Sequence, residues 1–219
     1  MRSLQTVNRG AGPSFISHTG IVAPFLRPNV DTDIIMPLNG RLALMGRDSL
    51  SEGERCFEPI RYLADGSENP DFILNQQPYR TASILLAGDN FGTGSSRESA
   101  ATGLRDFGFR SIIAPSFGEI FYNNCFANGV LPVVLDAEVI QQMADQVARN
   151  PEVETTVDLE ENHIRRPGLA AVSFSLDARL RNKLLLGLRD LDEILRYRGE
   201  ADVFLEGDQI RRPWVYNWH

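Results

Sequence analysis

Residues 88–97 carry the set of side chains in this sequence that is best suited to chemistry. Three glycines, an Asn and an Asp suit a tight turn, and two hydroxyl residues, Ser95 and Ser96, come directly before Arg97. Glycines let a ligand approach the backbone, hydroxyls donate hydrogen bonds, and a guanidinium pairs with a carboxylate or phosphate through a planar fork. The stretch therefore predicts an anion site.

The elements on either side of this turn support an anion site. Residues 81–87 form an apolar run with the length of a buried strand, and Glu98 follows Ser95 at the spacing of a capping box. A helix start leaves N–H groups unpaired, and its dipole favours negative charge. Two alternatives stay open: a ligand site, or a capped helix start with a solvent-exposed arginine. The loop holds no Lys, which argues against a Walker-type phosphate loop.

Composition excludes several classes of function. The 219 residues, 42% hydrophobic and 23% charged, suit one sizeable globular domain. A net charge of −7 argues against a nucleic-acid partner. No apolar run approaches the roughly 20 residues of a membrane span, and the N-terminus has no apolar signal core. We therefore expect a cytoplasmic protein.

The cysteines and histidines argue against a metal or a cluster in this chain. Cys56 and Cys125 are far apart in sequence, and the three histidines do not cluster. An iron–sulfur cluster is normally held by several thiolates. We therefore interpret both cysteines as structural and predict no metal ligands.

The order of the remaining elements predicts an α/β fold. Strands and helices alternate after the turn, which favours parallel pairing with right-handed crossovers, and two later strands around Pro167 suggest an antiparallel pair. The predicted elements are strands at 18–25, 110–115, 130–135, 155–159 and 169–176, and helices at 117–127 (capped by Ser116), 137–149 and 177–198 (broken at Gly187).

Residues 90–98, Asn-Phe-Gly-Thr-Gly-Ser-Ser-Arg-Glu, resemble the active-site loop of the swivelling domain of the aconitase superfamily. Within it, the sequence is most similar to the small subunits of 3-isopropylmalate dehydratase, with further matching motifs at 29–33, 69–75, 114–117, 122–125, 128–132 and 184–190. The resemblance implies a single swivelling β/β/α domain over residues 18–219 with a mainly parallel sheet, like the aconitase C-terminal domain. A loose arm at residues 1–17 would precede it.

The resemblance also implies an activity and a partner. Members of the family are hydro-lyase subunits that work only with a large subunit, which carries a four-iron four-sulfur cluster. Their substrate is a small dicarboxylic hydroxy acid: they interconvert 2-isopropylmalate and 3-isopropylmalate by dehydration and rehydration in leucine biosynthesis.

Site residues follow from the same resemblance. Ser95 matches the family's base, and Asp33 would support a histidine or water from across the subunit boundary. Ser96 and Arg97 would hold the substrate carboxylate. The other substrate-binding positions are Thr32, Asn90 and Gly94. Taken without the resemblance, Asp31 and Asp33 are ordinary turn-forming caps.

Some positions depart from the family pattern. These are Thr93, Ser99, Leu186 and the loop at 38–55, where Arg41 and Arg47 are either contacts to a second carboxylate or solvated arginines. The departures leave two alternatives: a paralogous subunit acting on another alkyl-malate or a citraconate-type substrate, and a non-catalytic carboxylate-binding regulatory subunit. A stand-alone anion-binding module is a third hypothesis. The aromatic C-terminal tail, residues 210–218, reads as a segment pinned to the core or to a subunit.

Overall fold

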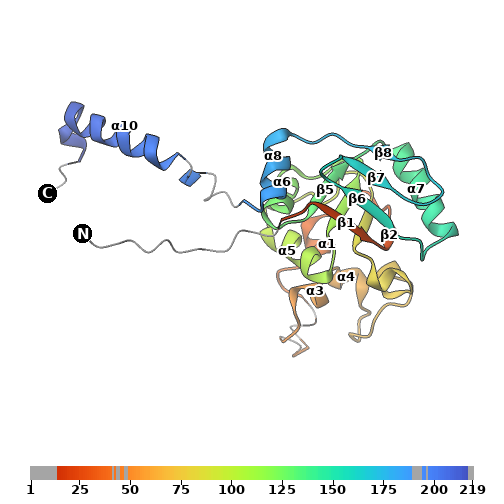
Figure 1. Cartoon of the computed structure of the whole chain (residues 1–219). Coiled ribbons are helices and arrows are strands. Elements are labelled where there is room, and N and C mark those ends of the chain that lie inside the picture. Colours follow the sequence, from red (N-terminus) through yellow and green to blue (C-terminus); the bar gives the residue numbers. More distant parts are fainter. Residues whose placement is uncertain are drawn as a thin grey trace.

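The computed structural model describes residues 14–40, 42, 45–46, 49–188, 194–195 and 197–216. Its framework is a pair of four-stranded sheets (Figure 1). The parallel sheet has the order β2-β3-β4-β5, with strands Val22–Phe25, Ile84–Ala87, Ser111–Ala114 and Leu131–Val134. The antiparallel sheet has the order β1-β6-β7-β8, with strands Ser17–Gly20, Thr155–Asp158, His163–Arg165 and Val172–Ser173.

Most of the helices connect the parallel strands or cover the sheets, and α10 lies apart from them (Figure 1). The longer ones are α5 (Glu98–Phe107), α6 (Glu119–Ala127), α7 (Ala137–Arg149), α8 (Ala178–Leu186) and α10 (Arg198–Arg211). Short helices occupy the connections: α1 (Thr32–Ile35), α3 (Glu52–Arg55), α4 (Glu58–Arg61), and the 3-10 turns η1 (Ile73–Asn75), η2 (Tyr79–Thr81) and η3 (Pro213–Val215).

The parallel sheet separates two hydrophobic cores. Along β3, Leu85 packs into the core that also contains Leu104 of α5, whereas Ile84 and Leu86 pack into the core that contains Val157 of the antiparallel sheet. Both faces of the strand are buried, so it reads as an unbroken apolar run rather than an alternating one. This layering confirms the predicted α/β class and the β/β/α arrangement.

Two strand predictions need correction. The single strand expected at 18–25 is two strands divided at Ile21, one in each sheet. The predicted strand at 155–159 does not pair with the one at 169–176, because β7 lies between them. β7 is only three residues long, too short for alternation to reveal it.

The two ends of the described chain differ in how they pack. Phe15, within the segment expected to be a loose arm, is buried and its N–H donates to the carbonyl of Leu184 at 2.9 Å. At the other end, α8 stops at Gly187 in the left-handed conformation, as predicted, and α10 stands apart from the domain (Figure 1). No helix in the described ranges is long and apolar enough to cross a membrane.

His18 links the two sheets and makes stability depend on pH. Its Nε2 lies 2.7 Å from the hydroxyl of Ser83, just before β3. Burial, and then the charge of Arg110, lower the pKa of His18 below its usual 6.5. As the pH falls through 6.5, His18 takes up a proton more readily in the unfolded chain than in the folded one. The contribution of His18 to the free energy of unfolding therefore decreases as the pH falls.

We predict that His18→Gln flattens the loss of stability between pH 7 and pH 5, because glutamine can bond to Ser83 but does not titrate. Urea unfolding of both proteins at several pH values measures how the free energy of unfolding depends on pH. Parallel curves for the wild type and the variant would contradict this prediction.

Candidate functional site

The candidate site is built from two loops that leave neighbouring strands at the carboxyl edge of the parallel sheet. One loop follows β2 and leads into α1, and the other follows β3 and leads into α5. Backbone bonds join them: Asn29 N–H to Asp89 O at 2.8 Å, Gly92 N–H to Val30 O at 2.8 Å, and Thr32 N–H to Thr93 O at 2.9 Å. This edge of an open α/β sheet is where ligands usually bind.

Helix α5 begins later than predicted. Its first residue is Glu98, its N-cap is Arg97 with extended backbone, and no side chain caps it. The expected capping box is therefore wrong: Glu98 accepts a hydrogen bond from Asn128 Nδ2 at 3.3 Å instead of turning back to Ser95. The positive φ of Gly94 turns the chain so that residues 95–97 stay outside the helix.

The late start of α5 leaves the hydroxyls of Ser95 and Ser96 free. Both residues are exposed, and within the described ranges neither side chain makes a hydrogen bond. Nor do the backbone N–H groups of residues 95–97 donate to any described acceptor. Together with the first turn of α5, they form a cradle of donors for an anion.

Arg97 borders this cradle and is held by Asp33. The guanidinium Nη1 forms an ion pair with the Asp33 carboxylate, and the Arg97 side chain is 16% exposed against 58% for Asp33. Asp31, two residues earlier, caps α1 by accepting from Ile34 N–H at 2.7 Å, so its interpretation as a turn cap is confirmed. The structure thus brings Asp33 and Arg97 together beside Ser95.

Thr32 and Gly94 lie in the same assembly. Thr32 is buried, and its hydroxyl donates to the carbonyl of Ser95 at 3.1 Å. That bond fixes the backbone of the loop just before Ser96. Gly94 is exposed at the turn, where its φ of 96° would strain any other residue.

Asn90 lies at the start of the loop and its side chain turns toward Asn29. Its Nδ2 donates to Asn29 Oδ1 at 2.9 Å, while its backbone N–H donates to the hydroxyl of Ser116 at 2.9 Å. Ser116 in turn donates to Asp89 at 2.6 Å. The expectation that Ser116 caps α6 is wrong, since the N-cap there is Gly118.

The sequence did not predict a role for Gly118, which packs against the loop that follows β3 and supports it. Its N–H donates to Phe91 O at 2.9 Å, and a Cβ at this position would lie 2.5 Å from the carbonyl oxygen of Gly92. Gly92 itself sits against the ring of Phe121. The contact is seen only in the folded structure. Gly118 lies between β4 and α6, far along the chain from Gly92.

The described residues do not fit a metal or a cluster. They contain no group of three or more His, Cys, Asp or Glu side chains able to hold a metal ion. Cys56 and Cys125 are fully buried, and burial raises the pKa of both thiols, so both stay protonated and packed.

Of the positions that depart from the family pattern, Thr93 and Ser99 adjoin the Ser95 loop and Leu186 lies in another element. Thr93 contributes its backbone to the bond with Thr32, and Ser99 lies in the first turn of α5. Leu186 is exposed at the end of α8. Arg41 and Arg47 lie outside the described residues. The described Leu42 is buried, and its N–H donates to the buried Glu58 at 2.8 Å.

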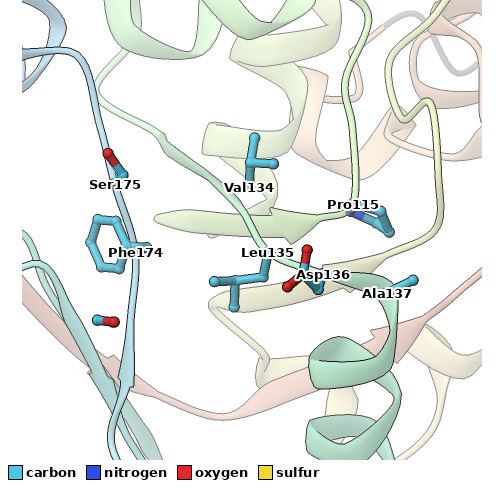
Figure 2. A pocket seen from close by; sticks show the side chains of 8 residues that line it. Pro115, Val134, Leu135, Asp136, Ala137, Phe174 and Ser175 are labelled. Atoms are coloured by element: carbon cyan, nitrogen blue, oxygen red, sulfur yellow. The ribbon is translucent and has the colours of Figure 1, made fainter.

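A separate pocket of about 350 Å³ opens where β5 passes into α7 (Figure 2). Val134 and Leu135 line it from one side and Phe174 from the other. Among the residues that line it, Asp136 is charged, and its carboxylate would repel an anionic ligand. The pocket contains none of the predicted site residues, so the Ser95 cradle is the better candidate.

Comparisons with known proteins match this chain to a known family. Residues 13–138 match the family model described as the aconitase C-terminal domain. The chain is 44% identical over 201 residues to the 3-isopropylmalate dehydratase small subunit of Agrobacterium fabrum, covering 92% of this chain and 98% of that one. It is 45% identical, with the same coverage, to the small subunit of Dinoroseobacter shibae.

A solved structure shows the same fold. The crystal structure of 3-isopropylmalate dehydratase from Methanocaldococcus jannaschii aligns with a TM-score of 0.58, at 21% identity, over 85% of this chain and 98% of that one.

We predict that Gly118→Ala destabilises the protein by about 1–3 kcal/mol, because the new methyl must displace the backbone of Gly92. For a chain of this size the melting temperature should fall by roughly 2–12 °C, and amides of the Ser95 loop should exchange faster. Gly199→Ala is the matched control, because apart from its chain neighbours and the backbone of its own helix no described atom lies within 4 Å of its added Cβ. Equal melting temperatures for both variants would rule out a supporting role for Gly118.

Proposed function

The chain belongs to the 3-isopropylmalate dehydratase small subunits, and we propose that its Ser95 loop forms one half of a dehydratase active site completed by a large subunit. Its activity is that of a hydro-lyase subunit in leucine biosynthesis. The observation that carries the proposal is the cradle itself. It combines two serine hydroxyls and several backbone N–H groups, none with a hydrogen-bond partner among the described residues, with a guanidinium that Asp33 holds in place.

The proposed reaction interconverts 2-isopropylmalate and 3-isopropylmalate. A proton leaves the carbon next to one carboxylate and a hydroxide leaves the neighbouring carbon, which yields an alkene and water. Addition of water with the two positions exchanged gives the isomer. Proton loss builds negative charge on the adjacent carboxylate, so the site needs fixed donors and a cation there.

We assign the proton transfer to Ser95. A free serine hydroxyl is far too weak a base for this step, so its ionised form needs strong stabilisation. Three features favour an alkoxide at this position: the N–H groups of residues 95–97, which have no acceptor in the described part of the chain, the start of α5, and the charge of Arg97. Because Ser95 does not cap the helix, its oxygen is available for this role.

Ser96 and Arg97 would bind the substrate carboxylate. The ion pair with Asp33 sets the direction of the Arg97 fork while leaving other N–H groups for the ligand. The Asp33 side chain is more than half exposed, so its carboxylate can also accept a hydrogen bond from a histidine or water of the partner. Thr32, Asn90 and Gly94 would act mainly by shaping the loop, given the contacts described above.

A large subunit would supply what this chain lacks. The described residues hold no metal-binding group, so we place the four-iron four-sulfur cluster in the large subunit, where it would act as the Lewis acid for departure of hydroxide. We also propose that the assembled enzyme works in the cytoplasm.

A second candidate substrate class follows from the position of Ser99. This residue departs from the family pattern and lies in the first helical turn of α5, beside the cradle, so the alternative substrate is another alkyl-malate or a citraconate-type acid. Turnover assays with a panel of malates that differ in the alkyl group separate the two candidates.

We predict that Ser95→Ala abolishes turnover while affinity for the substrate changes little, because a base acts in the transition state. The melting temperature should stay at the wild-type value, since Ser95 is not the N-cap. Ser96→Ala is the matched comparison and should weaken substrate binding more than it slows turnover. The measurement is steady-state kinetics of the assembled enzyme; near-normal turnover of Ser95→Ala on every malate tested would favour a regulatory subunit instead.

We also predict that Arg97→Lys lowers kcat/KM by about ten- to hundredfold, the effect of losing about 1.5–3 kcal/mol from a charged hydrogen bond. Lysine keeps the charge but loses the planar fork. Arg165→Lys, in an ion pair on the antiparallel sheet, is the control and should leave kinetics unchanged. Unaltered kinetics in Arg97→Lys would show that the guanidinium geometry plays no part.

A further inference from the structure

Glu98, the first residue of α5, carries a carboxylate directly beside the Ser95 loop. In a helix each Cα–Cβ bond tilts toward the N-terminus, so this side chain starts out toward the N–H groups of residues 95–97, which donate to no described acceptor. The helix dipole favours a negative charge at the same place. The spacing from Ser95 is also that of a capping box, in which a glutamate accepts from a backbone N–H three residues back. Local forces therefore draw the Glu98 carboxylate toward the anion cradle.

A carboxylate tethered at that position would compete with the carboxylate of a ligand. It would accept hydrogen bonds from the same N–H groups, and attachment to the same chain gives it a high effective concentration. The structure shows it elsewhere: Glu98 Oε1 accepts a hydrogen bond from the side-chain Nδ2 of Asn128 at 3.3 Å. A contact between α5 and the end of α6 thus decides where this carboxylate lies.

Asn128 is the C-cap of α6, the helix that packs against α5 (Figure 1). The residue is 6% exposed, and its backbone N–H donates to the carbonyls of Asn124 and Cys125, both at 3.1 Å. Gly129, with a φ of 71°, then turns the chain toward β5. The Asn128 side chain is therefore anchored at a fixed point beside α5.

Three contacts determine which way the Asn128 amide points. Its Nδ2 donates to Asn124 O at 3.0 Å as well as to Glu98, and its Oδ1 accepts from Arg105 Nη1 at 3.4 Å. Rotating the amide by half a turn would place Oδ1 against a carbonyl and a carboxylate, and Nδ2 against a guanidinium, so each contact would pair like with like. Glu98 and Arg105 lie two turns apart on one side of α5, about 10.5 Å along the axis, too far for an ion pair. The amide bridges these two charges.

We propose that Asn128 is a positioning residue that holds the Glu98 carboxylate away from the cradle, so that the donors of residues 95–97 stay open to the carboxylate of the substrate. The inference rests on the function proposed above, because that function supplies the competing ligand. Asn128 has no part in the proton transfer and acts on affinity. Freeing Glu98 should therefore raise KM, whereas saturating substrate displaces the competing carboxylate and should restore kcat.

The first test is steady-state kinetics of the enzyme assembled with its large subunit, with 3-isopropylmalate as substrate. Asn128→Asp replaces the donor with a carboxylate that repels Glu98, and we expect KM to rise about tenfold, the effect of one charged hydrogen bond, with kcat unchanged. Asn123→Asp is the matched control. Asn123 is exposed on the same helix, and its Nδ2 also donates to a carbonyl four residues back, that of Glu119, at 3.1 Å. The control gains the same charge and loses the same kind of bond, and its KM should equal that of the wild type.

A second substitution should rescue the first. Adding Glu98→Gln to Asn128→Asp leaves no carboxylate at position 98, keeps the net charge of the wild type, and lets the glutamine amide donate to the aspartate, so KM should return to the wild-type value. Asn128→Ala frees Glu98 without adding a charge and serves if Asn128→Asp does not fold; Glu98→Gln should rescue it too. A merely structural role of Asn128 would leave KM raised in both double variants, because the side-chain bond to Asn124 is still missing.

A further measurement needs neither the large subunit nor turnover. In the isolated chain, hydrogen exchange of the amides of residues 95–97 should slow in Asn128→Asp, because Glu98 then accepts hydrogen bonds from them, and should return to the wild-type rate when Glu98→Gln is added.

Wild-type KM in both Asn128→Asp and Asn128→Ala would overturn the proposal, as would a raised KM that persists in the double variants or exchange rates that do not change. A wild-type pair that turns over no malate would refute the hydro-lyase proposal alone, since the exchange rates of the isolated chain would still decide the role of Asn128.

Discussion

The candidate site depends on the backbone hydrogen bonds that join the loop after β2 to the loop after β3. Neither loop has regular structure of its own, and both carry residues with positive φ, Asn29 in one and Asn90 in the other. Joined, they place Thr32 under Ser95 and Asp33 beside Arg97, although these residues are more than 60 positions apart in sequence. The parallel pairing of β2 with β3 brings the loops together.

The ion pair between Asp33 and Arg97 adds direction to this arrangement. A guanidinium on a loop has many rotamers, and ordering it at the moment of binding costs free energy. Here the carboxylate of Asp33, in the first turn of α1, already fixes one edge of the fork, and the Arg97 side chain is mostly covered. Substrate would meet a cation whose orientation is set before binding.

Sequence reasoning reached the α/β class, the parallel strands and the position of the Ser95 loop, because buried strands and glycine turns have strong local signals. It misplaced the start of α5: Ser95 and Glu98 have the spacing of a capping box, but tertiary contacts draw Glu98 to Asn128. It also missed the support from Gly118 and the true partner of Ser116, since both depend on which strands are neighbours. A sequence pattern within one segment cannot predict which other loop that segment contacts.

The division of residues 17–25 between the two sheets has a consequence for how the chain folds. β2 pairs with β3 across about 60 residues, whereas β1, one residue before it, pairs with β6 across nearly 140. Closing a longer loop costs more entropy, and contacts between distant residues slow folding. During synthesis the parallel sheet has all its strands once residue 134 has emerged, but β1 must wait for β6. The antiparallel layer, and with it the second core, is therefore completed only after all strands of the parallel sheet are available.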